Sequence, residues 1–209
     1  MTKTHILLLI VLCTLCSCYP LGTFHGPDAL PEGEETVGVG VLWLSNVFTS
    51  MDTTLEAGTA FLGESSALFR LGLANDAEVG LKIVGLPWRV SSIRGDVKKQ
   101  LIHQPFLLSV DLGVSYWGSN RDTRYIGLHP TLLVGTEKTY GVIQFNHLES
   151  TWYLHQTADF ILGRHYKMKT NNYTLTPLIG VHANIETPED IYFSIGFGFN
   201  GPISDWNSR

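Results

Sequence analysis

Cysteine is missing from the chain after Cys18, and the three that occur, Cys13, Cys16 and Cys18, crowd into an apolar N-terminal stretch. A disulfide therefore has no partner region elsewhere in the chain. A metal site would need a fourth ligand, for which His5 and His25 are the nearest candidates. Neither use suits an apolar segment, which favours the third use of such a cysteine, a lipid anchor.

Charge is also scarce, because Asp, Glu, Lys and Arg make up 16% of the 209 residues. The formal net charge is −5 and basic residues form no cluster, which argues against a nucleic-acid partner. No apolar run is long enough for a membrane-spanning helix, and helical periodicity is never sustained. Glycine, by contrast, is abundant, with 21 residues.

The N-terminus has the pattern of a secretion signal. Lys3 lies in a short polar start, and residues 6–12 are an unbroken aliphatic run. The stretch LCSC, residues 15–18, resembles the bacterial lipobox, after which the chain is cut and the cysteine acylated. The resemblance implies that residues 1–17 are a lipoprotein signal peptide and that Cys18 begins the mature chain. An ordinary secretory signal, cleaved near the same point, is the alternative.

Residues 18–35 are expected to be the acylated N-terminus and a flexible tether, because residues 19–35 mix proline, glycine and acidic residues without a period. From Thr36 onward, apolar and polar residues alternate with a period of two, as in IYFSIGFGFN at 191–200. The pattern predicts a barrel over residues 36–200 and a polar tail over 201–209. Ten strands are expected, with 8–12 possible, at 36–44, 66–74, 78–84, 93–101, 106–117, 124–136, 139–147, 157–168, 173–184 and 191–200.

The connections between these strands alternate in length. The short ones lie near residues 75–77, 102–105, 137–138 and 169–172, and the longer ones near 45–65, 85–92, 118–123, 148–156 and 185–190. Successive connections lie at opposite ends of an up-and-down barrel. The pattern thus predicts short turns at the end that holds both termini and long loops at the other, as in outer-membrane barrels.

Alternation alone permits two barrels, a lipocalin-type soluble barrel with its apolar face inside and a membrane barrel with that face outside. Glycine favours the membrane barrel, because many glycines share the polar face and only a narrow lumen needs so many missing side chains. Eight charged residues on that face are predicted to form a neutral lumen network: Arg70, Glu78, Lys82, Arg94, Asp96, Lys98, Asp111 and Asp159. Arg164 breaks the rule, since it shares the parity of Phe160 and Leu162 near the short-turn end.

Two groups of residues could carry chemistry. His147, Glu149 and Ser150 are the components of a hydrolase, but they match no nucleophile motif, so a solvated loop is the preferred interpretation. Three histidines with lumen parity, His129, His165 and His182, could hold a metal only if they met at one height. The sequence therefore predicts no catalytic residue, no cofactor and no metal.

The stretch RLGLANDAEVGLKIVG and the tetrapeptide GDVK at 95–98 resemble features of small bacterial outer-membrane β-barrel lipoproteins. The resemblance implies the fold and membrane lipids and the barrel-assembly machinery as partners, but no activity. Many such barrels end on an aromatic residue, whereas here a polar tail follows Phe199. We therefore expect a non-enzymatic structural or binding protein with long external loops; a narrow pore or transporter and a lipid hydrolase are the alternatives.

Overall fold

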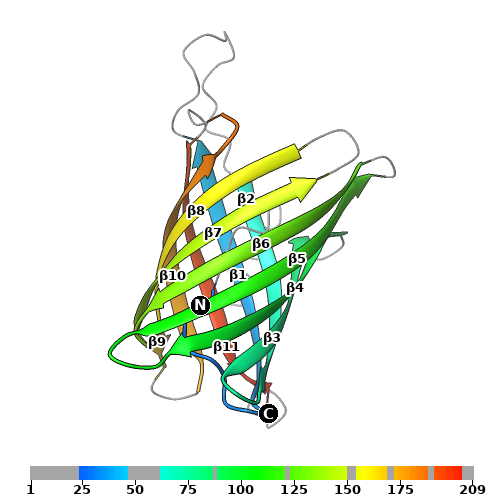
Figure 1. The fold of residues 1–209 in the computed structure, drawn as a ribbon. Helices are drawn as coiled ribbons and strands as arrows, with labels where there is room; N and C mark the ends of the chain where they lie inside the picture. The colour runs from blue at the N-terminus through cyan, green and yellow to red at the C-terminus, as the bar shows by residue number, and fades with distance from the viewer. Residues whose placement is uncertain are drawn as a thin grey trace, which may run out of the picture.

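The computed structural model describes residues 24–46, 62–86, 89–120, 123–149, 154–168, 172–187 and 191–203. They are almost entirely β-structure (Figure 1). The strands are β1 (Glu35–Asn46), β2 (Leu62–Leu73), β3 (Ala77–Leu86), β4 (Arg89–Ile102), β5 (Leu107–Asn120), β6 (Thr123–Gly135), β7 (Thr139–Glu149), β8 (Leu154–Arg164), β9 (Tyr166–Lys167), β10 (Thr174–Asn184) and β11 (Ile191–Pro202).

The sheet closes on itself. Consecutive strands pair antiparallel from β1 to β8, β10 pairs with β8 and β11, and β11 pairs with β1 through partners such as Val39 and Phe199. The two-residue β9 follows β8 after a break at His165, and both pair with β10. β8 and β9 therefore act as one interrupted strand, and the barrel has ten strands. The all-β, antiparallel up-and-down barrel and its ten strands are therefore confirmed.

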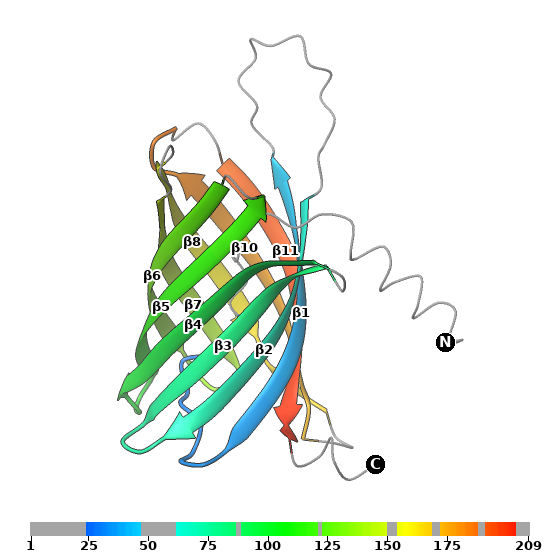
Figure 2. The same ribbon diagram turned by 90° about the vertical axis from the view of Figure 1, so that its right-hand side faces the viewer.

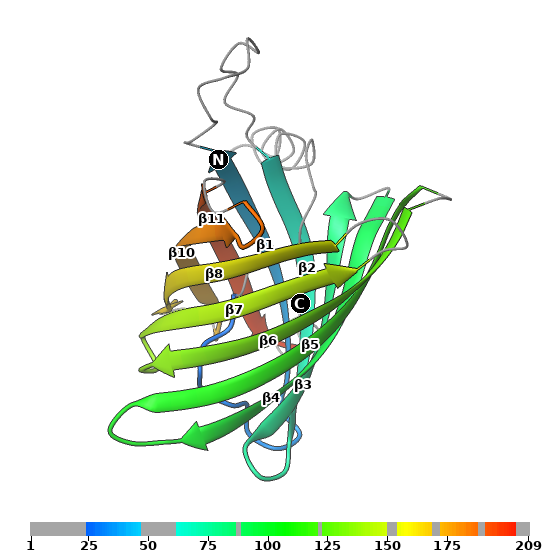
Figure 3. The same ribbon diagram turned by 45° about the horizontal axis from the view of Figure 1, so that its top comes forward.

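The short turns lie at the end where β1 begins and β11 finishes, at the bottom of Figure 2. The turn that joins β2 to β3 contains Asn75 and Asp76, whose φ values are 59° and 55°. Both residue types tolerate this left-handed conformation, which a tight hairpin requires. Figure 3, in which the top of the barrel is tilted forward, shows how the strand order β8, β10, β11, β1 closes the barrel.

The prediction of long connections at the opposite end is wrong at two of the five positions. β3 and β4 are separated only by residues 87–88, and β5 and β6 only by residues 121–122. The strands there continue past the point where their apolar alternation fades, so sequence that looked like loop is strand. Residues 185–190, between β10 and β11, separate the strands as predicted, and residues 47–61, between β1 and β2, lie outside the described residues.

The strands place their polar face inside. In β5, Ser109, Asp111 and Ser115 are buried, while Val110 and Leu112 between them are exposed. A water-soluble barrel would have the reverse arrangement. Exposed large apolar residues encircle the barrel: Val39, Leu81, Ile93, Val97, Leu112, Ile126, Phe145, Phe160, Leu162, Ile179, Ile195 and Phe197 are examples.

The barrel also encloses part of its own N-terminal segment. Phe24 and His25 are buried, and the chain then leaves through the short-turn end, where residues 31–34 are exposed, before β1 begins. We call residues 24–34 the plug. The composition of this region predicted a tether without packed structure, and the burial of Phe24 and His25 differs from that prediction. No helix among the described residues is long and apolar enough to cross a membrane.

Candidate functional site in the barrel lumen

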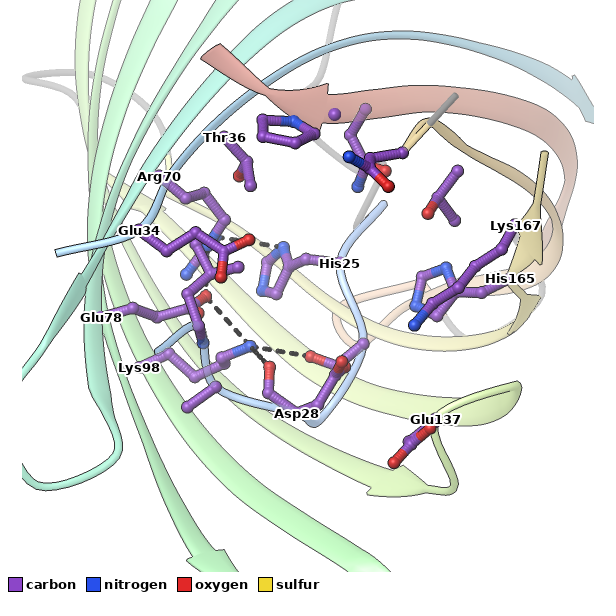
Figure 4. A pocket seen from close by; sticks show the side chains of 18 of the residues that line it. His25, Asp28, Glu34, Thr36, Arg70, Glu78, Lys98, Glu137, His165 and Lys167 are labelled. Carbon is purple, nitrogen blue, oxygen red and sulfur yellow. Dashed lines mark hydrogen bonds and ion pairs between the residues drawn. The ribbon is translucent and has the colours of Figure 1, made fainter. Parts of the chain in front are cut away.

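The plug is held chiefly through its backbone. Lys98 of β4 donates to the backbone oxygens of Gly26, at 2.9 Å, and Asp28, at 2.7 Å (Figure 4). The Leu30 amide donates to Glu78 Oε2 at 2.9 Å, and the Ala29 amide donates to Gln100 Oε1 at 2.8 Å. Lumen side chains thus satisfy backbone groups of a segment that has no sheet partner at these positions.

An aromatic side chain anchors the plug at its inner end. Phe24 is 6% exposed and lies against β1 and β11, where the chain has Gly40 and Gly198. A Cβ at position 198 would stand 2.7 Å from the Cβ of Phe24, which is too close for any side chain. These two glycines therefore create the space that the ring fills.

His25 connects the plug to the lumen charges. Its Nδ1 lies 3.2 Å from Nη1 of Arg70, and its Nε2 lies 3.3 Å from Oδ2 of Asp111. Burial, followed by the positive charges of Arg70 and Lys98, holds the pKa of His25 well below its usual value. A neutral ring can accept from Arg70 at Nδ1 and present an N–H towards Asp111 at Nε2.

All eight predicted lumen charges are buried. Arg70 pairs with Glu78 and, at 2.9 Å, with Asp96; Lys98 lies 3.0 Å from Glu78. Arg94 lies 3.6 Å from Asp111. The structure thus brings together six of the eight residues.

Lys82 and Asp159 complete the set of predicted charges. Lys82 lines a small cavity beside Arg94, Asp96 and Phe24, next to the cluster. Asp159, on β8, is the outlier, since its partners are Asn146 and His182. Cys18, the predicted acylation site, lies outside the described residues.

A chain of amides joins the two groups of charges. Arg94 Nη1 donates to Gln144 Oε1 at 3.0 Å, and Gln144 Nε2 donates to Asn146 Oδ1 at 2.7 Å. Asn146 in turn donates to Asp159. Gln144 and Asn146 were not among the predicted lumen residues, although their shared parity in β7 would have placed both in the lumen.

Two serine–histidine pairs lie along the same network. Ser194 Oγ is 2.7 Å from Nε2 of His182, whose Nδ1 is 3.0 Å from Asp159. Ser115 Oγ is likewise 2.7 Å from Nε2 of His129, whose Nδ1 is 2.7 Å from Asn146. The order serine, histidine, aspartate is that of a serine hydrolase. Ser194, however, is only 6% exposed, so its hydroxyl is not open to a substrate.

Glycines explain both pairs. Gly127 pairs with Ser115 across β5 and β6, and Gly180 pairs with Ser194 across β10 and β11. A Cβ at Gly180 would lie 2.7 Å from Ser194 Oγ and 3.1 Å from His182 Nε2. The serine and histidine therefore already occupy the space above the glycine, where a substrate would have to bind. We interpret the pairs as lumen packing.

The other candidate sites do not assemble. His147 lies 3.0 Å from Gln156, and Ser150 is outside the described residues. His165 lies 2.8 Å from Thr176, far from the partners of His129 and His182. Within the described ranges, no three His, Cys, Asp or Glu side chains are grouped closely enough to hold a metal ion.

Beneath the plug, the short-turn end opens into a cavity of about 770 Å³. We call it the vestibule. His25, Asp28 and Lys98 line its inner part, and His103, Glu137 and Lys167 line its outer part. Figure 4 shows the plug crossing this space between the β2–β4 side chains and His165. The vestibule is polar, carries both signs of charge and ends at the plug.

The strand pairings and burial define the class of the protein as a closed antiparallel β-barrel with a polar, filled interior. No family model and no curated protein matches the chain. Two crystal structures are similar to it: Ail, the attachment invasion locus protein of Yersinia pestis, and the same protein in complex with the heparin analogue sucrose octasulfate. Their TM-scores are 0.31 and 0.33 respectively, and each match has 10% identity and covers 82% of this chain and 99% of that chain.

Proposed function

We propose that the protein is an outer-membrane β-barrel lipoprotein with a non-enzymatic structural or binding role, whose lumen is closed by its own N-terminal plug. The observation that carries this proposal is the exposed apolar belt around a barrel that buries its charges. Soluble monomers rarely expose contiguous apolar patches above a few hundred Å². A bilayer would cover this belt, while ion pairs and the plug fill the lumen.

The plug also supports an anchor in the same membrane. Cys18 lies six residues before Phe24, and an extended chain of that length reaches about 20 Å. An acyl group on Cys18 would therefore stay close to the barrel. With the short-turn end in the periplasm, the barrel-assembly machinery would meet β11, which ends two residues into the predicted tail, at Pro202.

A narrow pore is the second candidate, and the vestibule is the observation that favours it. Ions could enter the vestibule but would meet the plug and then the Arg94–Gln144–Asn146 chain. We expect the full-length protein to show no stepwise conductance in planar bilayers. Reproducible conductance steps from the native chain would favour the pore over the closed barrel.

The proposal is tested by membrane fractionation with acyl labelling of the native protein and of Cys18→Ala. We expect labelled native protein in the outer membrane and loss of the label in the variant. Heat-modifiable migration in a detergent gel tests the closed barrel separately. Recovery of the native protein in the soluble periplasmic fraction would overturn the proposal.

A further inference from the structure

The barrel wall has a defect on one side, between β8 and β10. The pairing of β10 with β9 ends at Leu175, opposite Tyr166, and the pairing of β10 with β8 begins at Leu178, opposite Gly163. Pro177 lies between these two ladders and has no N–H to donate. The interruption spans Arg164 and His165 on the opposing strand, and the outer surface is hollowed there.

The hollow is a groove of about 260 Å³ on the outward side of the barrel. Leu162, Ile179, Ile195 and Phe197 give it an apolar wall, and each is exposed. Arg164 lines the same groove. The groove thus combines aliphatic and aromatic walls with a single cation.

Arg164 stands at the short-turn edge of this groove. It pairs with Thr139, the first residue of β7 after a short turn, and its guanidinium lies 5.1 Å from the ring centre of Tyr166. An arginine on a lipid-facing surface costs about 2–4 kcal/mol at the bilayer midplane and about 0–1 kcal/mol near the interface. Its position suits the interface, where lipid phosphates lie.

We propose that this groove binds one anionic phospholipid, with an acyl chain along Leu162, Ile179 and Phe197 and the phosphate on Arg164. The inference rests on the proposed membrane location and adds a defined lipid site to it. Charge complementarity selects the ligand, because a guanidinium forms charge-assisted hydrogen bonds with phosphate. The diacylglycerol expected on Cys18 has no anionic group and would leave Arg164 without a negatively charged partner.

The test uses the full mature protein in nanodiscs made from equal parts phosphatidylcholine and phosphatidylglycerol. After gentle release, native mass spectrometry counts the phosphatidylglycerol that stays bound to the barrel. We expect one retained molecule, and about fivefold less retention in Arg164→Gln, since one cation near a membrane surface contributes about that factor. Lys99→Gln is the matched control, because Lys99 is also on the outward face at the short-turn end but lies outside the groove.

A second variant keeps the test decisive if Arg164→Gln inserts poorly. Ile179→Trp fills the groove while keeping the belt apolar, and it should also lower retention. Equal retention by the native protein, Arg164→Gln and Ile179→Trp would overturn the lipid site while leaving the membrane barrel intact. A native protein that never enters nanodiscs would instead contradict the proposed function itself.

Discussion

The ammonium group of Lys98 lies 2.7 Å from the backbone oxygen of Asp28, 70 residues earlier in the chain. This contact joins the plug to the barrel wall, and the same ammonium pairs with Glu78 at 3.0 Å. Glu78 in turn accepts from the Leu30 amide and from Arg70. The lumen charges therefore balance one another and also hold the plug.

Loss of the Lys98 ammonium should loosen the plug. Lys98→Gln weakens two bonds to plug carbonyls, and each charged hydrogen bond contributes about 1.5–3 kcal/mol. With Pro27→Cys as a buried reporter, we expect a maleimide to react at least about tenfold faster in the Lys98→Gln background. Lys99→Gln, one residue along and facing outward, should leave the rate unchanged. Equal rates in all three proteins would show that Lys98 does not hold the plug.

Removing the Asp159 carboxylate should lower the free energy of unfolding. Asp159→Ala leaves an amide N–H of Asn146 without its acceptor and removes the carboxylate that lies 3.0 Å from His182 Nδ1. A buried donor left without its acceptor costs about 1–3 kcal/mol. Urea unfolding of the vesicle-bound protein, followed by tryptophan fluorescence, should show this loss. His147→Ala, whose side chain is only half-buried, is the control and should change stability by less than about 0.5 kcal/mol.

Acid should destabilise the plug through His25. The folded state keeps the ring neutral, because the pKa of His25 is lowered by burial and by Arg70 and Lys98, against the opposing pull of Asp96 and Glu78. The unfolded state binds a proton below about pH 6.5, so stability falls as pH drops from that value towards the lowered pKa.

The effect can be isolated by comparing variants. Between pH 7.5 and pH 5 the native protein should lose up to about 2 kcal/mol through this group. His25→Gln, whose neutral amide does not titrate in this range, should show a smaller drop in thermal midpoint over the same interval. An identical pH dependence in both proteins would assign the acid sensitivity to the carboxylates.

A charge placed on the apolar belt should cost more near its middle than at its rim. Leu112, well inside β5, is 53% exposed, and Leu73 ends β2 at the short-turn end. Leu112→Arg should destabilise the vesicle-bound protein by about 2–4 kcal/mol and Leu73→Arg by about 0–1 kcal/mol. Equal small effects at both positions, measured by urea unfolding, would contradict a bilayer around the belt.

Period-two alternation made the barrel predictable. In β5 the alternation of Val110 and Asp111 assigned the two residues to opposite faces of the sheet. The many glycines on the polar face then indicated that this face lies inside the barrel. The same parity placed His129 and His182 in the lumen. It was less useful at the far ends of the strands, where alternation fades although β4 already begins at Arg89.

The plug could not be predicted for a different reason. Its main contacts use backbone groups, such as the carbonyls of Gly26 and Asp28 and the amide of Leu30, and backbone groups leave no mark in composition. Proline and glycine in this stretch fit a loose tether and a segment threaded through side chains equally well. Only the tight space at Gly40 and Gly198 hints that something large must fit beside them.

The most direct test of the orientation is a spin-label scan along β5, from Ser109 to Val114, with the protein in phospholipid vesicles. We expect labels at Val110, Leu112 and Val114 to collide with lipid-soluble oxygen, and labels at Ser109 and Asp111 to be shielded from it. Preferential collision of the labels at Val110, Leu112 and Val114 with a water-soluble nickel complex would contradict the account.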